Sequence, residues 1–229
     1  MRLSISSTNV QEWSGDVLVV GLPKGDPSTT AVNLESRFPG VSSALNQQAF
    51  EGKTGQKLVL HPLANGNPQR LVLIGLGDAD AIDLDGIRAA AAAAAQTSIG
   101  CNGCLGIQFP WDSQDSDQAA RISAEAVRLS LYADQRFQKE PEERRLPTAL
   151  ELIGLPASAA AGLKSVNATC AGVELARELV AAPPNYVTPA ALAETAAALA
   201  RDYGMELTIL ERADCEARGM GAFLAVSQG

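Results

Sequence analysis

The chain contains few of the side chains from which nucleophilic active sites are built. Its 229 residues include one histidine, His61, and four cysteines. A Ser-His-Asp or Cys-His arrangement would have to use His61, and the chain contains no Gly-x-Ser-x-Gly nucleophile elbow. Because His61 precedes Pro62 at the end of a predicted strand, we expect a structural or surface residue here rather than a catalyst.

Disulfides, export signals and membrane spans are not indicated either. Four cysteines are too few for a disulfide framework in a domain of this size, and reduced thiols are typical of the cytosol. Residues 1–9 contain no apolar segment of signal-peptide length, and no stretch approaches about 18 uninterrupted apolar residues. The run Ala89–Ala95 is too short and too weakly hydrophobic to cross a bilayer. We therefore predict a cytoplasmic protein with no membrane partner.

Basic residues are outnumbered by acidic ones. The chain carries 18 Lys and Arg against 26 Asp and Glu, for a net charge of −8, and no basic run is longer than Arg144-Arg145. Because binding to nucleic-acid phosphates depends on clustered Lys and Arg, this balance argues against a nucleic-acid partner.

Strand patterns alternate with helix patterns through the first two thirds of the chain. The predicted strands are Arg2–Ser6, Asp16–Leu22, Lys57–Leu63, Arg70–Leu76, Cys104–Phe109 and Thr148–Leu155. The predicted helices are Val41–Phe50, Leu84–Ile99 and Ser116–Phe137. We expect a loop at Gly25–Thr30, and a turn at Asn65–Pro68 that joins the third and fourth strands as an antiparallel hairpin. This order predicts an α/β fold, a mixed sheet covered by helices on both faces.

The character of the sequence changes after residue 155. Residues 157–171 are rich in small side chains, and we place a domain boundary there, giving domains 1–155 and 156–229. An amphipathic helix over Gly172–Ala182 should end at Pro183-Pro184, and Thr188-Pro189 should cap and begin the next helix.

Two further strands are predicted in the second part, at Met205–Leu210 and in the apolar run Ala222–Val226. An isolated pair of strands is marginally stable and needs further elements to cover its face. We therefore expect that the chain is the front part of a longer protein, with its second domain only begun.

Three motifs could carry chemistry, and each has a simpler explanation. Gly75-x-Gly77 lacks the third glycine of a dinucleotide fingerprint, since Asp80 stands in its place, so a tight turn after the strand is favoured. Cys101 and Cys104 have the spacing of half a zinc site but no second pair of ligands. The acidic residues between 78 and 85 do not have calcium-loop spacing, and they suit the positive end of a helix dipole.

The corner between the two helices carries a resemblance to a known family. The segment Val-Ala-Ala-Pro-Pro-Asn-Tyr-Val-Thr-Pro (180–189) and the closing Arg-Gly-Met-Gly-Ala-Phe-Leu-Ala-Val-Ser-Gln-Gly (218–229) closely resemble the opening of the catalytic domain of leucine aminopeptidases. The strong part covers about the last 60 residues, and the earlier part matches in the order of its elements. In this family the N-terminal domain is a mixed sheet similar to the macro fold.

The resemblance implies a two-metal leucyl aminopeptidase, which removes N-terminal residues, leucine preferred, from peptides with a free N-terminus. Two divalent ions, manganese or zinc, would activate water and polarise the scissile carbonyl. The family assembles as a homo-hexamer of two stacked trimers. Its ligand motifs, similar to Lys-Gly-x-Thr-Phe-Asp-Ser-Gly-Gly and Asn-Thr-Asp-Ala-Glu-Gly-Arg, do not occur here.

We therefore assign no catalytic, cofactor-binding or metal-binding residue to this chain, and expect the 229 residues alone to bind no metal ion and to be inactive. Two alternatives remain open. One is a macro-like module that binds a nucleotide or ADP-ribose. The other is a non-catalytic oligomerisation domain.

Overall fold

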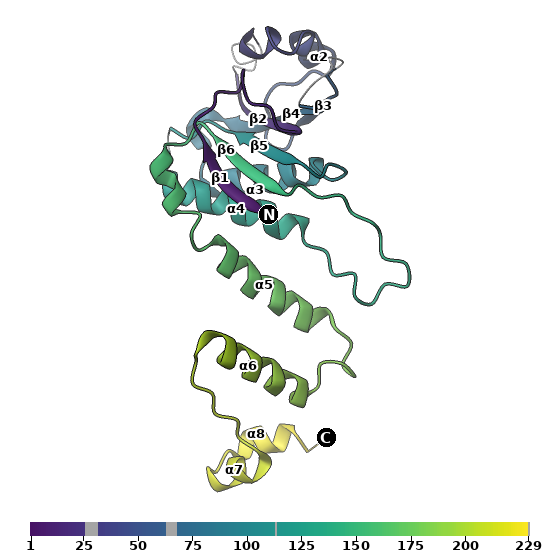
Figure 1. Ribbon diagram of the computed structural model, residues 1–229, viewed down its shortest axis with the longest axis vertical. Helices are drawn as coiled ribbons and strands as arrows, with labels where there is room; N and C mark the ends of the chain where they lie inside the picture. The colour runs from purple at the N-terminus through teal and green to yellow at the C-terminus, as the bar shows by residue number, and fades with distance from the viewer. Residues whose placement is uncertain (26–31, 63–67, 113, 229) are drawn as a thin grey trace. The chain divides into compact units, whose positions relative to one another are not determined.

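The computed structural model describes residues 1–25, 32–62, 68–112 and 114–228 (Figure 1). Contacts divide the chain into two compact units, Met1–Arg177 and Glu178–Gly229, and each is described by itself. The division falls inside a helix, whereas the sequence pattern places the boundary before that helix begins. The boundary after residue 155 stays a prediction.

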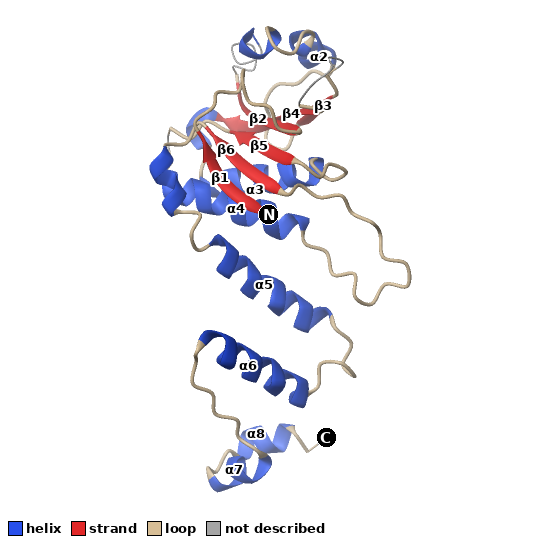
Figure 2. Ribbon diagram, viewed as in Figure 1, coloured by secondary structure: helices blue, strands red, loops and turns tan. Residues whose placement is uncertain are grey.

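The first unit is built on a six-stranded mixed sheet (Figure 2). Its strands are β1 (Arg2–Ser6), β2 (Val17–Lys24), β3 (Lys57–Leu60), β4 (Arg70–Asp78), β5 (Cys104–Gln108) and β6 (Ala149–Ile153). They lie in the order β1-β6-β5-β2-β4-β3, and β3 alone runs antiparallel to its neighbour. The six strands predicted in this part of the chain and the predicted β3–β4 hairpin are confirmed. Most of the predicted hairpin turn, and most of the predicted loop at Gly25–Thr30, lie outside the described residues.

Helices cover both faces of the sheet, as the alternating pattern predicts. On one face, side chains of β2 and β5 pack with α3 (Leu84–Thr97), α4 (Ser116–Leu131) and the 3₁₀ turn η2 (Ala157–Ala161). On the other face, β2 and β4 pack against α2 (Val41–Gln47) and residues 34–38. Figures 1 and 2 show α2 on one side of the sheet and α3 and α4 on the other.

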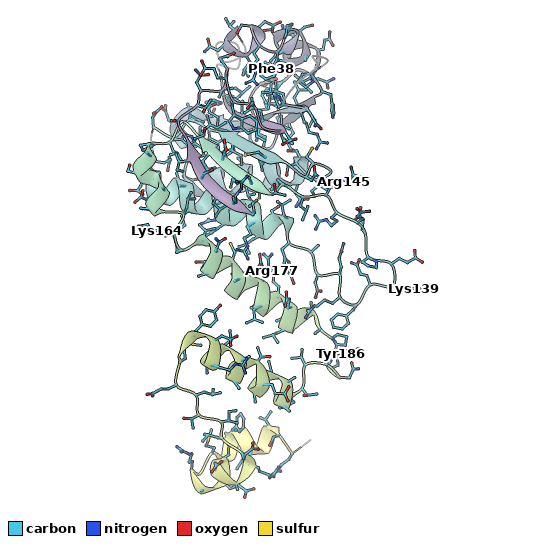
Figure 3. All side chains as sticks on the ribbon, viewed as in Figure 1. Phe38, Lys139, Arg145, Lys164, Arg177 and Tyr186 are labelled. Atoms are coloured by element: carbon cyan, nitrogen blue, oxygen red, sulfur yellow. The ribbon has the colours of Figure 1, made fainter. Side chains whose placement is uncertain are left out.

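Helix α4 is shorter than its periodicity predicts. Residues 132–137 fit the helical pattern, but α4 ends at Leu131 and Tyr132 is extended. Two arginines take the carbonyls that are left without helical partners: Arg144 donates to the Leu131 carbonyl oxygen at 3.0 Å, and Arg177 to that of Leu129 at 2.8 Å. The segment that follows is exposed, and Figure 3 shows Lys139 on it. Long-range hydrogen bonds, which local periodicity does not contain, therefore stabilise the end of this helix.

Three further helices follow the long helix α5 (Val166–Ala181), which ends before Pro183: α6 (Pro189–Tyr203), α7 (Arg212–Ala217) and α8 (Gly221–Val226). The Thr188 hydroxyl accepts a hydrogen bond from the Ala191 amide at 3.2 Å, and Pro189 is the first helical residue, so the predicted cap is confirmed. Gly204, with φ of 66°, ends α6 in the left-handed conformation.

The two strands predicted in the second part are wrong for the described structure. Residues 205–210 belong to no strand, and Met205, Leu207 and Ile209 are 43–53% exposed. The run Ala222–Val226 lies in α8, where the Leu224 amide bonds to the Met220 carbonyl oxygen at 3.0 Å. A strand needs a neighbour for its backbone hydrogen bonds, and every described strand lies in the first unit. A short helix satisfies its own backbone.

One ion pair joins α4 to α5 within the first unit. The guanidinium of Arg128 donates from Nε and Nη2 to the two carboxylate oxygens of Glu174, at 2.8 and 2.7 Å, and from Nη1 to Asn167 Oδ1 at 2.9 Å. The side chains of Arg128 and Glu174 are 26% and 21% exposed. The Glu174 carboxylate raises the pKa of Arg128. A bidentate, half-buried pair of this kind orients helices more strongly than a solvated pair.

We expect Arg128→Gln to lower the free energy of unfolding by about 1–2 kcal/mol, because it leaves Glu174 without its partner. Arg88→Gln is the matched control, since Arg88 pairs with Asp85 on an exposed part of α3 and should change stability by about 0.5 kcal/mol at most. Urea unfolding followed by circular dichroism measures both. Equal effects of the two substitutions would contradict the role given to Arg128.

Candidate functional site

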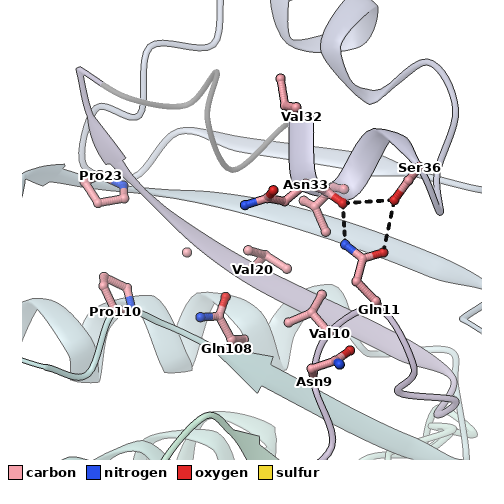
Figure 4. Close-up of a pocket in the computed structure, with 12 residues that line it drawn as sticks. Asn9, Val10, Gln11, Val20, Pro23, Val32, Asn33, Ser36, Gln108 and Pro110 are labelled. Carbon is pink, nitrogen blue, oxygen red and sulfur yellow. Dashed lines mark hydrogen bonds between the residues drawn. The ribbon is translucent and has the colours of Figure 1, made fainter.

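A pocket opens where the chain changes from one face of the sheet to the other. Strands β2 and β5 are parallel neighbours, but β2 leads to the helices on one face and β5 leads to α4 on the other. In open α/β sheets, ligands bind beyond the carboxyl ends of strands at such a switch point. The pocket has a volume of about 660 Å³, within the range of small-molecule sites (Figure 4).

The pocket combines apolar walls with neutral polar groups. Its lining residues are Asn9, Val10, Gln11, Val20, Gly21, Pro23, Val32, Asn33, Leu34, Ser36, Gln108 and Pro110. Gln11 Nε2 donates to the Asn33 carbonyl oxygen, and the Ser36 hydroxyl is 3.4 Å from Gln11 Oε1 (Figure 4). None of these lining residues is ionisable at neutral pH. The arrangement can bind a ligand by hydrogen bonds and apolar contact, but it offers no general acid, general base or nucleophile of adjusted pKa.

The glycine pair after β4 is occupied by another part of the chain. The Gly75 amide donates to the Gln56 carbonyl oxygen at 2.9 Å, and the Gly77 amide donates to that of Gly52 at 2.9 Å. A Cβ at Gly75 would lie 2.1 Å from the Lys53 carbonyl oxygen. The amides that a pyrophosphate would need are therefore already bonded, and the glycines allow residues 52–56 to approach the strand. The structure supports the turn over the dinucleotide fingerprint.

Three of the four acidic residues between 78 and 85 have separate partners. Asp83 accepts a hydrogen bond from the Gly86 amide at 2.8 Å and caps α3. Asp78 pairs with Lys24 at 3.2 Å, and Asp85 pairs with Arg88. These contacts fit the helix-start explanation. Across the described residues, no group of three or more His, Cys, Asp or Glu side chains is placed to hold a metal ion.

The histidine and the cysteine pair also have ordinary surroundings. His61 is exposed, next to the hydrophobic pocket formed by Phe38, Val41 and Leu71. All four cysteines are free. The Cys104 amide donates to Asp16 Oδ2 at 2.7 Å, and Glu151, which lies on neighbouring strand β6, accepts a hydrogen bond from Trp13 Nε1 at 2.8 Å. Burial, followed by the Glu151 and Asp16 carboxylates, raises the pKa of the Cys104 thiol to about 12. Cys104 is therefore a poor nucleophile at neutral pH.

Sequence reasoning missed the residues that line the pocket at the switch point. Asn9 and Gln11 lie in a connecting segment and Asn33 lies in the short helical stretch 32–35, which the sequence pattern did not predict. Only Gln108, at the carboxyl end of a predicted strand, had a position that could have indicated a site. No helix among the described residues is long and apolar enough to cross a membrane.

Comparison with known proteins matches two parts of the chain to one family. Residues 18–141 match the model described as "Cytosol aminopeptidase family, N-terminal domain", and residues 174–229 match "Cytosol aminopeptidase family, catalytic domain". A Synechococcus sp. (strain CC9902) protein named "Probable cytosol aminopeptidase" is 95% identical over all 229 residues, which are 47% of that protein. The chain thus spans about half the length of the curated relatives it matches.

Solved structures agree with this assignment. A mutant of tomato leucine aminopeptidase is similar over 99% of this chain and 47% of its own, with a TM-score of 0.88 and 29% identity. The bottromycin maturation enzyme BotP, in complex with Mn, is similar over 82% of this chain and 37% of its own, with a TM-score of 0.59 and 26% identity. The mixed sheet flanked by helices, and the resemblance carried by the helix corner, are confirmed.

We expect Gly75→Ala to lower the free energy of unfolding by about 1–3 kcal/mol, because its Cβ meets backbone that cannot move without breaking hydrogen bonds. Gly86→Ala is the control, since its nearest neighbour is Asp83 Oδ1 at 3.4 Å, and it should stabilise α3 by about 0.5–1 kcal/mol. Urea unfolding measures both. If Gly75→Ala were as stable as Gly86→Ala, the packing role of Gly75 would be wrong.

We expect Cys104 to resist alkylation in the folded chain. With a pKa of about 12, only about one thiol in 10,000 is ionised at pH 8, against roughly a quarter in the unfolded chain. Iodoacetamide labelling at pH 8, read by mass spectrometry, should be at least about a hundredfold slower for Cys104 in native than in guanidinium-denatured protein. Similar rates in the two states would contradict a half-buried, protonated thiol.

Proposed function

The chain belongs to the cytosol aminopeptidase family, and we propose that it is the N-terminal part of a leucyl aminopeptidase that removes N-terminal residues from peptides. One observation carries the proposal: the N-terminal and catalytic domain models of a single family match in succession, at residues 18–141 and 174–229. The preference for leucine follows from the resemblance of the helix corner and from the name of the tomato structure.

The proposed reaction depends on metal ions, for which the described part of this chain offers no cluster of ligands. The described residues offer no group of ligands for even one ion, and the fold neighbour that was solved with Mn is a longer protein. We propose that two divalent ions, manganese or zinc, bind to residues outside this chain. No step of the reaction is assigned to a residue between 1 and 229.

The proposed contribution of this chain is structural. The first unit supplies a sheet with two buried faces, and the Arg128–Glu174 pair joins α4 to the part of α5 that belongs to this unit. The two domains of the proposal are 1–155 and 156–229, the second being the opening of the catalytic domain. We further propose that the protein is cytoplasmic and assembles as a homo-hexamer. The names of the curated relatives support the cytoplasmic location.

A macro-like module that binds a nucleotide or ADP-ribose is the second candidate function. The size of the pocket at the switch point suits a small-molecule ligand. None of its described lining residues, however, is a Lys or Arg that could neutralise a phosphate. The oligomerisation domain is favoured by no particular contact among the described residues.

We expect the 229-residue chain to hydrolyse no leucyl p-nitroanilide, with or without added Mn²⁺ or Zn²⁺, because its described residues form no group of ligands for the ions. The longer parent protein should hydrolyse the same substrate and lose activity with a chelator. N-acetyl-leucyl p-nitroanilide, whose α-amino group is blocked, is the control and should not be cleaved. Metal-dependent hydrolysis by the chain alone, or an inactive parent protein, would overturn the proposal.

A further inference from the structure

The pocket at the switch point has hydrogen-bonding groups that make few or no bonds to other described residues. The side-chain amide of Asn33 makes no hydrogen bond to another described residue. Gln108 Nε2 has only one long contact, of 3.4 Å, to the Phe109 carbonyl oxygen. Asn9 uses Oδ1 to accept from the Glu12 amide at 3.1 Å, which leaves its Nδ2 group. In Figure 4 the side chains of Asn33 and Gln108 lie on opposite sides of Val20. Donors and acceptors therefore border an apolar floor.

The two cations that adjoin lining residues in the chain, Lys24 next to Pro23 and Arg37 next to Ser36, are already paired. Lys24, at the end of β2, lies 3.2 Å from Asp78, and the guanidinium of Arg37 donates to the backbone carbonyl oxygens of Val10 and Trp13. Since the chain also carries a net charge of −8, an anionic ligand would meet repulsion and no free positive group in the described lining. A charged ligand of either sign would lose hydration without gaining a counter-charge from the described lining residues.

We propose that this pocket binds an uncharged small molecule through an amide edge, that is, a neighbouring N–H and C=O. Primary amides such as those of Asn33 and Gln108 offer the complementary pair of donor and acceptor, and Val10, Val20 and Pro110 supply apolar contact for the rest of the ligand. An amide edge occurs both in nucleobases and in peptide bonds. The inference does not depend on peptidase activity, because the site lies wholly in the first unit.

Isothermal titration calorimetry of the full chain tests the proposal with two neutral probes and two charged ones. Inosine presents the amide edge of a nucleobase, and N-acetyl-leucinamide presents that of a peptide. We expect at least one to bind with a dissociation constant of about 0.01–1 mM, the range for a small ligand held by a few neutral hydrogen bonds. Inosine monophosphate and ADP-ribose should bind no more tightly than inosine. The neutral probe that binds identifies the source of the ligand.

Asn33→Leu and Gln108→Leu should each weaken binding of that probe by about tenfold, because each removes amide hydrogen bonds. Gln118→Leu removes an exposed amide on α4, across the sheet, and should leave the dissociation constant unchanged. Circular dichroism checks that the variants are folded. The comparison of neutral with charged probes uses the unchanged protein, so it tests the proposal even if a variant unfolds.

Three outcomes would overturn the proposal. Neither neutral probe binds, or a charged nucleotide binds at least tenfold more tightly than inosine, or folded Asn33→Leu and Gln108→Leu bind as the unchanged chain does. Because calorimetry does not measure hydrolysis, a negative result here leaves the proposed peptidase function intact, and an inactive parent protein would leave this proposal intact.

Discussion

The burial of both faces of β2 is the constraint on which the rest of the first unit depends. Val17 and Val19 are buried in the core on one side of the sheet, and Leu18, Val20 and Leu22 in the core on the other. Such a strand is stable only if helices cover both faces of the sheet. Apolar surface left in water on either face would cost roughly 25 cal/mol per Å². Helices α3 and α4 therefore lie on one face and α2 on the other.

The pocket is a consequence of the same constraint. Because the next described helices after β2 and β5 pack on opposite faces of the sheet, a crevice remains beyond the carboxyl ends of these adjacent strands. The fold thus produces a cavity before any ligand is considered. What the cavity can bind is decided by the side chains at its border, which are uncharged amides and small apolar residues.

The second unit lacks a constraint of this kind. Its helices are short after α6, and several of its large apolar side chains are exposed, among them Tyr203, Phe223 and Val226 at 62–86%. Helices α7 and α8 have six residues each, so most of their stability must come from packing rather than from propensity. The caps at Thr188 and Gly204 define the ends of α6 locally, without help from another part of the chain.

The sequence by itself determined the elements whose cause is local or periodic. The six strands of the sheet, the hairpin, the alanine-rich helix α3 and the Thr188-Pro189 cap depend on side-chain periodicity, propensity and capping, which are all readable within a few residues. The family was recognisable because the residues that resemble it include one continuous segment, 180–189, which can be read without the tertiary structure.

Tertiary structure decided whatever depends on residues far apart in the chain. Arg144 and Arg177 stabilise the end of helix α4 by hydrogen bonds to its last turn, and residues 205–210 pair with no strand among the described residues. The pocket joins residues 9–11, 33 and 108, which no spacing rule connects. Hydrogen bonds and cavities between distant segments exist only once the sheet is assembled, so local patterns contain no record of them.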